Sequence, residues 1–135
     1  MTYEGGCYCG ALRYVAEGEP RMKAECHCRP CAYFSGGAPN LFVVLSEKGF
    51  RYTSGTPKSF TRPDLENAVT REFCGDCGTQ ILTRRPGVKA VIIKAGTLDD
   101  PALFGAQQMA IYTSGKQAFN HIPDGLPAFE GLPPR

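Results

Sequence analysis

Seven cysteines in three tight groups constrain the fold of this 135-residue chain more than any other feature. The groups are Cys7-Tyr8-Cys9, Cys26-His27-Cys28-Arg29-Pro30-Cys31 and Cys74-Gly75-Asp76-Cys77. An odd number of cysteines cannot all pair in disulfides, and thiols this close in sequence are suited to clamping one soft, tetrahedral metal ion. We therefore predict that the groups bind metal, and zinc suits thiolate ligands.

The rest of the chain favours a mainly β fold. Its 16 glycines and 11 prolines favour turns between short strands over long helices. Residues 99–104, with an acidic cap before a proline, predict a helical turn. Residues 90–94 form the strongest strand pattern, which we expect at the centre of a sheet. The other strands are expected at 11–17, 22–25, 40–45, 50–53, 59–62, 68–73, 80–83 and 107–112.

The length of the chain suits one domain, residues 1–135, in which 115–135 form an extended, proline-rich C-terminal arm. Fifteen basic against 13 acidic residues give a net charge of +2, which predicts neither nucleic-acid binding nor membrane binding. Without a long apolar segment or a basic-then-apolar N-terminal run, we expect a cytoplasmic protein with reduced thiols. The oligomeric state does not follow from these observations.

Glycine placement divides the cysteines into a set of four and a set of three. Gly10 follows the first group, and Gly78 follows the third. Such a glycine lets the backbone turn with a positive φ and direct N–H groups at sulfur, which offsets thiolate charge in a closed site. We therefore assign Cys7, Cys9, Cys74 and Cys77 to a structural zinc.

The remaining cysteines, Cys26, Cys28 and Cys31, then form a second zinc site with one coordination position open, as in catalytic sites. Two zinc ions per chain follow. The competing interpretation has a single four-cysteine zinc and inert central cysteines. His27 is interpreted as a packed residue rather than a fourth ligand, because its flanking cysteines already face the metal. His121 is expected to have an ordinary surface role.

Several residues near the open site are candidates for substrate contacts: Arg29, Phe34, Gly36 and Gly37. The glycines would let a ligand approach the backbone, although an ordinary loop explains them equally well. Arginines could also meet carboxylates of an acidic substrate, although a solvated position is favoured for each of Arg29, Arg71, Arg84 and Arg85.

The order of these motifs resembles the glutathione-dependent formaldehyde-activating enzyme family, which is grouped with centromere protein V. The resemblance rests on Cys7–Gly10, Cys26–Cys31, Phe73–Thr79 and Ala95–Pro101, and it covers about residues 6–126. It implies several small coiled antiparallel sheets stapled by zinc, called a β-tent. It also implies a structural zinc on Cys7, Cys9, Cys74 and Cys77 and a glutathione-linked zinc on Cys26, Cys28 and Cys31. Ala32, Ala110 and Phe119 depart from residues common in the family.

The activity implied by the resemblance is that of a zinc-dependent carbon–sulfur lyase. Glutathione and formaldehyde would form S-hydroxymethylglutathione, with the three central cysteines as the catalytic zinc ligands. Two other functions remain open at this point. One is a glutathione or small-thiol carrier without turnover, and the other is a protein-interaction module.

Overall fold

The computed structural model describes residues 1–134, and the chain forms mainly β-strands there, as predicted. Arg135, the last residue of the predicted arm, lies outside the described residues. The strands are β1 (Thr2–Gly6), β2 (Arg13–Glu17), β3 (Met22–Cys26), β4 (Asn40–Ser46), β5 (Phe50–Ser54), β6 (Lys58–Thr61), β7 (Thr70–Phe73), β8 (Gln80–Arg84), β9 (Ala90–Lys94) and β10 (Met109–Ile111). The helices are α1 (Arg29–Ser35) and the 3-10 turns η1 (Glu47–Gly49), η2 (Ala95–Thr97), η3 (Pro101–Leu103) and η4 (Thr113–Gly115).

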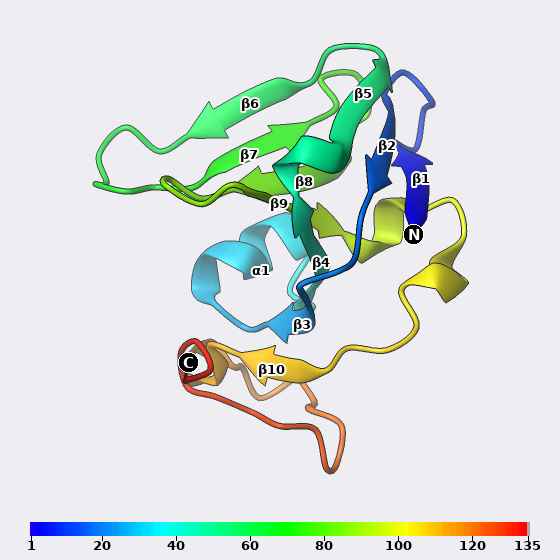
Figure 1. Cartoon of the computed structure of the whole chain (residues 1–135). Coiled ribbons are helices and arrows are strands. Elements are labelled where there is room, and N and C mark those ends of the chain that lie inside the picture. The colour runs from blue at the N-terminus through cyan, green and yellow to red at the C-terminus, as the bar shows by residue number, and fades with distance from the viewer. Residues whose placement is uncertain (135) are drawn as a thin grey trace.

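The strands form two sheets, which Figure 1 shows meeting near the middle of the molecule. The smaller sheet has the order β1-β2-β5, and the larger has the order β10-β3-β4-β9-β8-β7-β6. Strand β9 is the fourth of seven, so the prediction of a central strand at Ala90–Lys94 is confirmed. Pairing is antiparallel as expected, except that β10 runs parallel to β3.

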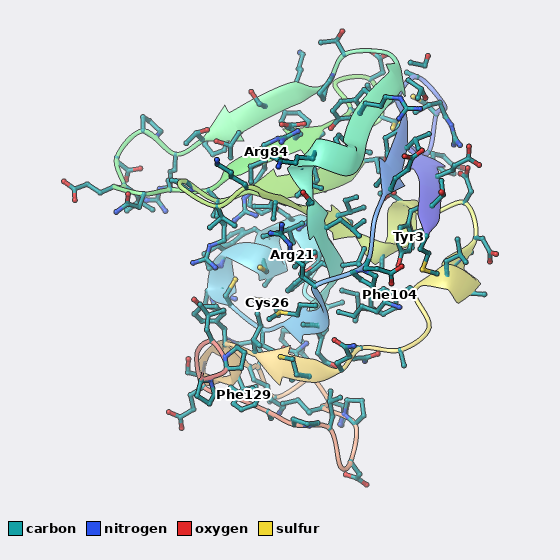
Figure 2. All side chains as sticks on the ribbon, in the orientation of Figure 1. Tyr3, Arg21, Cys26, Arg84, Phe104 and Phe129 are labelled. Atoms are coloured by element: carbon teal, nitrogen blue, oxygen red, sulfur yellow. The ribbon has the colours of Figure 1, made fainter. Side chains whose placement is uncertain are left out.

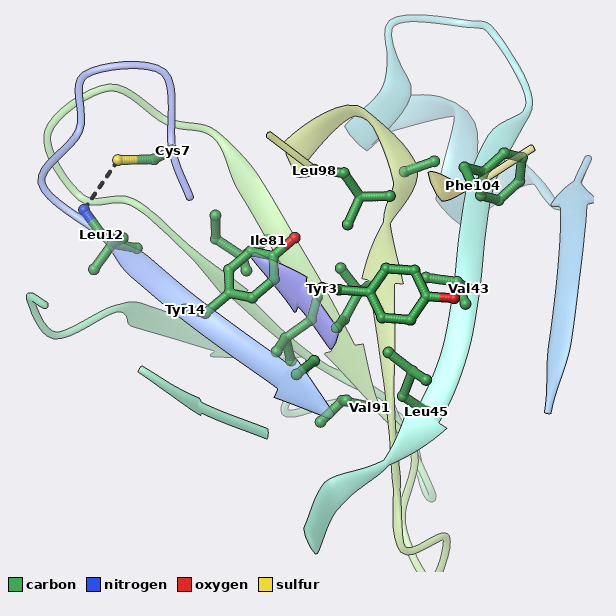
Figure 3. Packing of buried hydrophobic residues seen from close by; sticks show 14 of the residues in the cluster. Tyr3, Cys7, Leu12, Tyr14, Val43, Leu45, Ile81, Val91, Leu98 and Phe104 are labelled. Atoms are coloured by element: carbon green, nitrogen blue, oxygen red, sulfur yellow. Dashed lines mark hydrogen bonds between the residues drawn. The ribbon is translucent and has the colours of Figure 1, made fainter. Parts of the chain in front are cut away.

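The main core fills the space between the two sheets, as Figure 3 shows. Alternation that begins one residue before β2 buries Leu12, Tyr14 and Ala16 at 2%, 1% and 0% exposure. Tyr3 from β1 and Ile93 from β9 are fully buried in the same cluster. Burying each large side chain contributes about 1.5–3 kcal/mol, so this layer fixes how the sheets face each other.

Strand β1 and helix α1 were not predicted, and each has a local reason. Gly5 and Gly6 within β1 resemble turn residues. A Cβ on Gly5 would lie 2.3 Å from the Thr97 carbonyl oxygen, so close packing explains that glycine. Helix α1 has seven residues, too few for a helical hydrophobic period. It ends at Gly36, whose φ of 71° forms a left-handed cap.

The C-terminal segment lies along the edge strand β10 (Figure 1). The Ala110 N–H donates to the Pro127 carbonyl at 2.8 Å, and the Phe129 N–H donates back to the Ala110 carbonyl at 2.9 Å. After η4, residues 116–134 contain neither helix nor strand. Figure 2 places Phe129 below β10, and this side chain packs against the cluster that contains Cys26 and Ile111.

No helix in residues 1–134 has both the length and the apolar character needed to cross a bilayer. The assignment of residues 1–135 to a single zinc-binding domain stays a prediction.

Candidate metal sites

The first cysteine site joins the loop after β1 to the loop after β7. The Sγ atoms of Cys7, Cys9, Cys74 and Cys77 all lie within 4.8 Å of one another. Cys7 and Cys74 are buried, and Cys9 and Cys77 are exposed. Figure 3 shows Cys7 at the edge of the main core. The four sulfurs that glycine placement grouped together are thus close in space.

Backbone N–H groups surround the buried sulfurs of this site. Leu12 donates to Cys7 Sγ at 3.1 Å, and Asp76 donates to Cys74 Sγ at 3.4 Å. Gly10 and Gly78 adopt φ of 84° and 80°, which other residues rarely adopt. The turns therefore have the form expected of loops that direct donors at thiolates.

Thr79 completes this site, and sequence reasoning did not find it. Its Oγ1 lies 3.1 Å from Cys77 Sγ and accepts a hydrogen bond from the Tyr8 N–H, also at 3.1 Å. Hydrogen bonds from the Thr79 side chain and backbone lower the pKa of Cys77 to about 5. The same residue thus supports a thiolate and ties the two loops together.

The donor set and spacing of the four sulfurs fit zinc. A tetrahedral ion with Zn–S bonds of about 2.3 Å requires sulfurs about 3.8 Å apart. Cys9 Sγ lies 3.6 Å from Cys7 Sγ and 3.7 Å from Cys74 Sγ. These two distances match a bound zinc ion, and the other sulfur pairs lie within 4.8 Å, so the four cysteines are compatible with zinc.

The second cysteine site lies where β3 runs into α1. Cys26 ends β3, Cys28 caps α1, and Cys31 lies in its first turn. Their Sγ atoms lie within 4.8 Å of one another, and in residues 1–134 no fourth histidine, cysteine or carboxylate joins the group. Cys26 and Cys31 are buried, while Cys28 is partly exposed. Figure 2 places Cys26 between α1 and β10.

This site has the donors for zinc but a tighter arrangement. The Sγ atoms of Cys28 and Cys31 lie 2.7 Å apart. Two thiolates on one zinc need about 3.8 Å, so holding an ion would spread this pair by about 1 Å. Hydrogen bonding with Cys26 and then Cys31 lowers the pKa of Cys28 to about 3. Hydrogen bonding with Cys28, and to a lesser extent with Cys31, raises the pKa of Cys26.

His27 points away from the sulfurs, toward a buried carboxylate. Its Nε2 lies 2.6 Å from Glu25 Oε2, and the side chains of His27 and Glu25 are 0% and 3% exposed. The Gln107 amide donates to the other Glu25 oxygen at 2.8 Å. This arrangement agrees with the interpretation of His27 as a packed residue. The sequence did not indicate that Glu25 would contact His27 and Gln107.

Two cations, the buried Arg71 and the half-buried Lys94, lie near the three cysteines. The Lys94 ammonium donates to Thr83 Oγ1 at 3.3 Å, and the Arg71 guanidinium stacks 4.1 Å from the centre of the Phe34 ring. Neither forms an ion pair with a carboxylate within residues 1–134. The expectation of a solvated position is wrong for Arg71, which lies within β7, is only 9% exposed and stacks on Phe34.

A cavity of about 320 Å³ opens beside Cys31. Helix α1 and the turn after it form one wall, and residues at the ends of β4, β8 and β9 form the others. The lining includes Cys31, Phe34, Asn40, Gln80 and Lys94. Asn40 is buried, and its Nδ2 approaches Cys31 Sγ at 3.9 Å.

Of the residues predicted to contact substrate, Phe34 lines this cavity, whereas Arg29, Gly36 and Gly37 are not among its lining residues. The Arg29 guanidinium lies 5.5 Å from the centre of the exposed Tyr33 ring. Gly36 caps α1, and Gly37 has a φ of 93° beside Phe119. Arg84 pairs with Glu72 instead of approaching the cavity.

Comparison with known proteins supplies a family and a fold. The family model described as glutathione-dependent formaldehyde-activating enzyme matches residues 2–115. A crystal structure of a Rhodobacter sphaeroides protein aligns with a TM-score of 0.61 at 18% identity, over 79% of this chain and 97% of that one. At that identity the likeness supports the fold alone. A comparison with curated proteins gives no significant match.

Proposed function

The chain belongs to the glutathione-dependent formaldehyde-activating enzyme family, and on that premise we propose that it adds a small thiol such as glutathione to a small aldehyde as a zinc-dependent carbon–sulfur lyase. The observation that carries the proposal is the cluster of Cys26, Cys28 and Cys31, which gathers three sulfurs beside a cavity. Three protein ligands and an open position are typical of catalytic zinc, and four ligands of structural zinc.

In this proposal Cys26, Cys28 and Cys31 hold a catalytic zinc, and Cys7, Cys9, Cys74 and Cys77 hold a structural one. When bound at the three-cysteine site, zinc supplies Lewis acidity that lowers the pKa of a thiol ligand from about 8.5, so that the thiol reacts as thiolate at neutral pH.

Two cationic side chains, Lys94 and Arg71, favour a negatively charged sulfur at the three-cysteine site. Three thiolates and one zinc ion together carry one net negative charge, and an incoming thiolate makes it two. Lys94 and Arg71 supply two positive charges nearby, in partly buried positions where charges interact more strongly than in water. The nearby charges therefore balance when a thiolate is bound.

The reaction is an addition in which nothing is oxidised or reduced. The thiol loses its proton, its sulfur forms a bond to the carbonyl carbon, and the carbonyl π electrons move to oxygen, which takes up a proton. The walls of the cavity beside Cys31 would hold the thiol in place while the aldehyde approaches its sulfur.

The test must separate catalysis from the spontaneous reaction of thiols with aldehydes. Exchange between free and adduct glutathione is measured by NMR saturation transfer in formaldehyde, with zinc-loaded protein at several concentrations. We expect the exchange rate to rise with protein concentration and to saturate with glutathione. Lys23→Met, whose ammonium faces Phe104 and the Leu103 carbonyl, serves as the folded control, and Cys28→Ala is expected to remove the acceleration.

Glutathione binding without acceleration would favour a carrier over an enzyme. The proposal would be contradicted if protein carrying two zinc ions neither bound glutathione nor accelerated adduct exchange. A stoichiometric protein partner would then point to an interaction module.

A further inference from the structure

Lys94 is the only charged side chain among the described residues that line the cavity beside Cys31. It lies at the end of the central strand β9, where its ammonium has one hydrogen-bond partner within residues 1–134, Thr83 Oγ1. An ammonium has three donors, so part of its capacity is unused. Burial lowers the pKa of Lys94 to about 8, which reflects how poorly the wall solvates its charge.

Gln80 is a second polar residue of the cavity lining. Its Oε1 is shielded from solvent and has no hydrogen-bond partner within residues 1–134. Leaving a buried acceptor unpaired is costly, and most such groups in folded proteins have a partner. Gln80 lines the same cavity as Lys94, but an amide oxygen only accepts hydrogen bonds, so an anionic group there would be bound by Lys94 and not by this atom.

The sulfur of a ligand and its charged group would lie within the same small space. Cys31 and Lys94 both line the cavity, whose volume of about 320 Å³ is near the lower end for small-molecule sites. A thiol with its sulfur at the three cysteines therefore has its substituent next to Lys94. A carboxylate there would accept the unused N–H donors and offset the charge that burial makes costly.

We propose that this cavity selects acidic thiols, with Lys94 binding the carboxylate of the thiol whose sulfur occupies the open position at Cys26, Cys28 and Cys31. Lys94 is thus a specificity-determining residue. The inference rests on the proposed function only in taking the three cysteines as the thiol site, and it requires no turnover.

The experiment compares two probes that differ in charge but hardly in shape, 3-mercaptopropionate and 3-mercaptopropionamide. Protein with Co²⁺ in place of zinc reports thiolate binding through its absorption bands, and titration gives a dissociation constant for each probe. We expect the acid to bind about tenfold more tightly than the amide, since a charge-assisted hydrogen bond is lost in the amide.

Three variants make the test specific. Lys94→Met should abolish the preference for the acid, because it lowers the affinity for the acid about tenfold more than the affinity for the amide, and Lys94→Arg should keep most of the preference. Lys23→Met is the matched control, because Lys23 is a half-buried lysine of the same sheet whose ammonium faces Phe104 and the Leu103 carbonyl. It should leave the preference unchanged.

Two outcomes would overturn the inference. An equal loss for both probes in Lys94→Met would mean that Lys94 supports the cysteines and not the carboxylate. A preference that survives Lys94→Met, or is missing from the unmodified protein, would place the carboxylate elsewhere. Failure of the proposed function has a different signature, namely an intact, Lys94-dependent preference without acceleration of adduct exchange.

Discussion

The Sγ atoms of Cys9 and Cys74 lie 3.7 Å apart, although the two residues are separated by 65 positions in the sequence. Cys9 follows β1 of the three-stranded sheet, and Cys74 follows β7 of the seven-stranded sheet. A metal ion held by both would therefore tie the two sheets together at the edge of the core that they share. This relationship gives the two cysteine sites different expected roles.

Substitution of one cysteine in each site tests that division of labour. Structural zinc supplies on the order of 10 kcal/mol, which is comparable to the whole stability of a small domain. We expect Cys77→Ala to be unfolded at room temperature. Cys28→Ala should remain folded and lose one zinc ion, because its site caps only the short helix α1. Thermal melts followed by circular dichroism, with zinc counted by elemental analysis, check both. Equal destabilisation would argue against the division.

Stepwise removal of metal should separate the sites in the unmodified protein. The three-cysteine site offers one ligand fewer, so a moderate chelator should take one zinc ion per chain while the circular dichroism spectrum is retained. A stronger chelator should take the second ion and unfold the protein. A zinc indicator and circular dichroism on one sample follow both steps. Simultaneous release of both ions with unfolding would contradict independent sites.

The buried His27–Glu25 pair should matter for stability and not for metal content. His27→Ala leaves the Glu25 carboxylate buried without that partner, which costs about 3–5 kcal/mol in comparable pairs. We expect this loss in urea unfolding of the zinc-loaded protein, with two zinc ions retained. His121→Ala, at an exposed position, is the control and should change stability by less than about 0.5 kcal/mol. Loss of one zinc ion from His27→Ala would instead identify His27 as a ligand.

The Arg13–Asp99 ion pair should make a small contribution to stability at neutral pH that disappears in acid. Both side chains are partly exposed, so we expect less than about 1 kcal/mol. The Arg13 guanidinium lowers the pKa of Asp99 below its usual value. The pair therefore stabilises the fold above the unfolded pKa of about 3.9 and loses this effect as pH falls through the lower folded value.

Urea unfolding of Asp99→Asn beside the unmodified protein checks this, since their difference in stability should shrink between about pH 5 and pH 3. Asp124→Asn, at an exposed position without an ion pair in residues 1–134, should show no such pH dependence. A difference that grows toward acid would have the wrong sign.

Local sequence patterns were sufficient for most of the fold. Alternation in 11–17 and the apolar run 90–94 correspond to β2 and the central β9, because side-chain direction in a strand follows from position alone. The cap at Asp100 precedes η3 as expected, and its side chain accepts from the Ala102 N–H. Helix α1 was missed because a seven-residue helix that is held by its caps shows no hydrophobic period.

The sequence by itself determined which cysteines could share a metal ion, because spacing and glycine placement act within a few residues of each sulfur. Only the tertiary structure decided what surrounds the three-cysteine site. Lys94 and Gln80 reach its cavity from β9 and β8, and Arg71 stacks on Phe34 from β7. Their approach depends on strand order and register across the sheet, and no local pattern in the chain records how distant strands align.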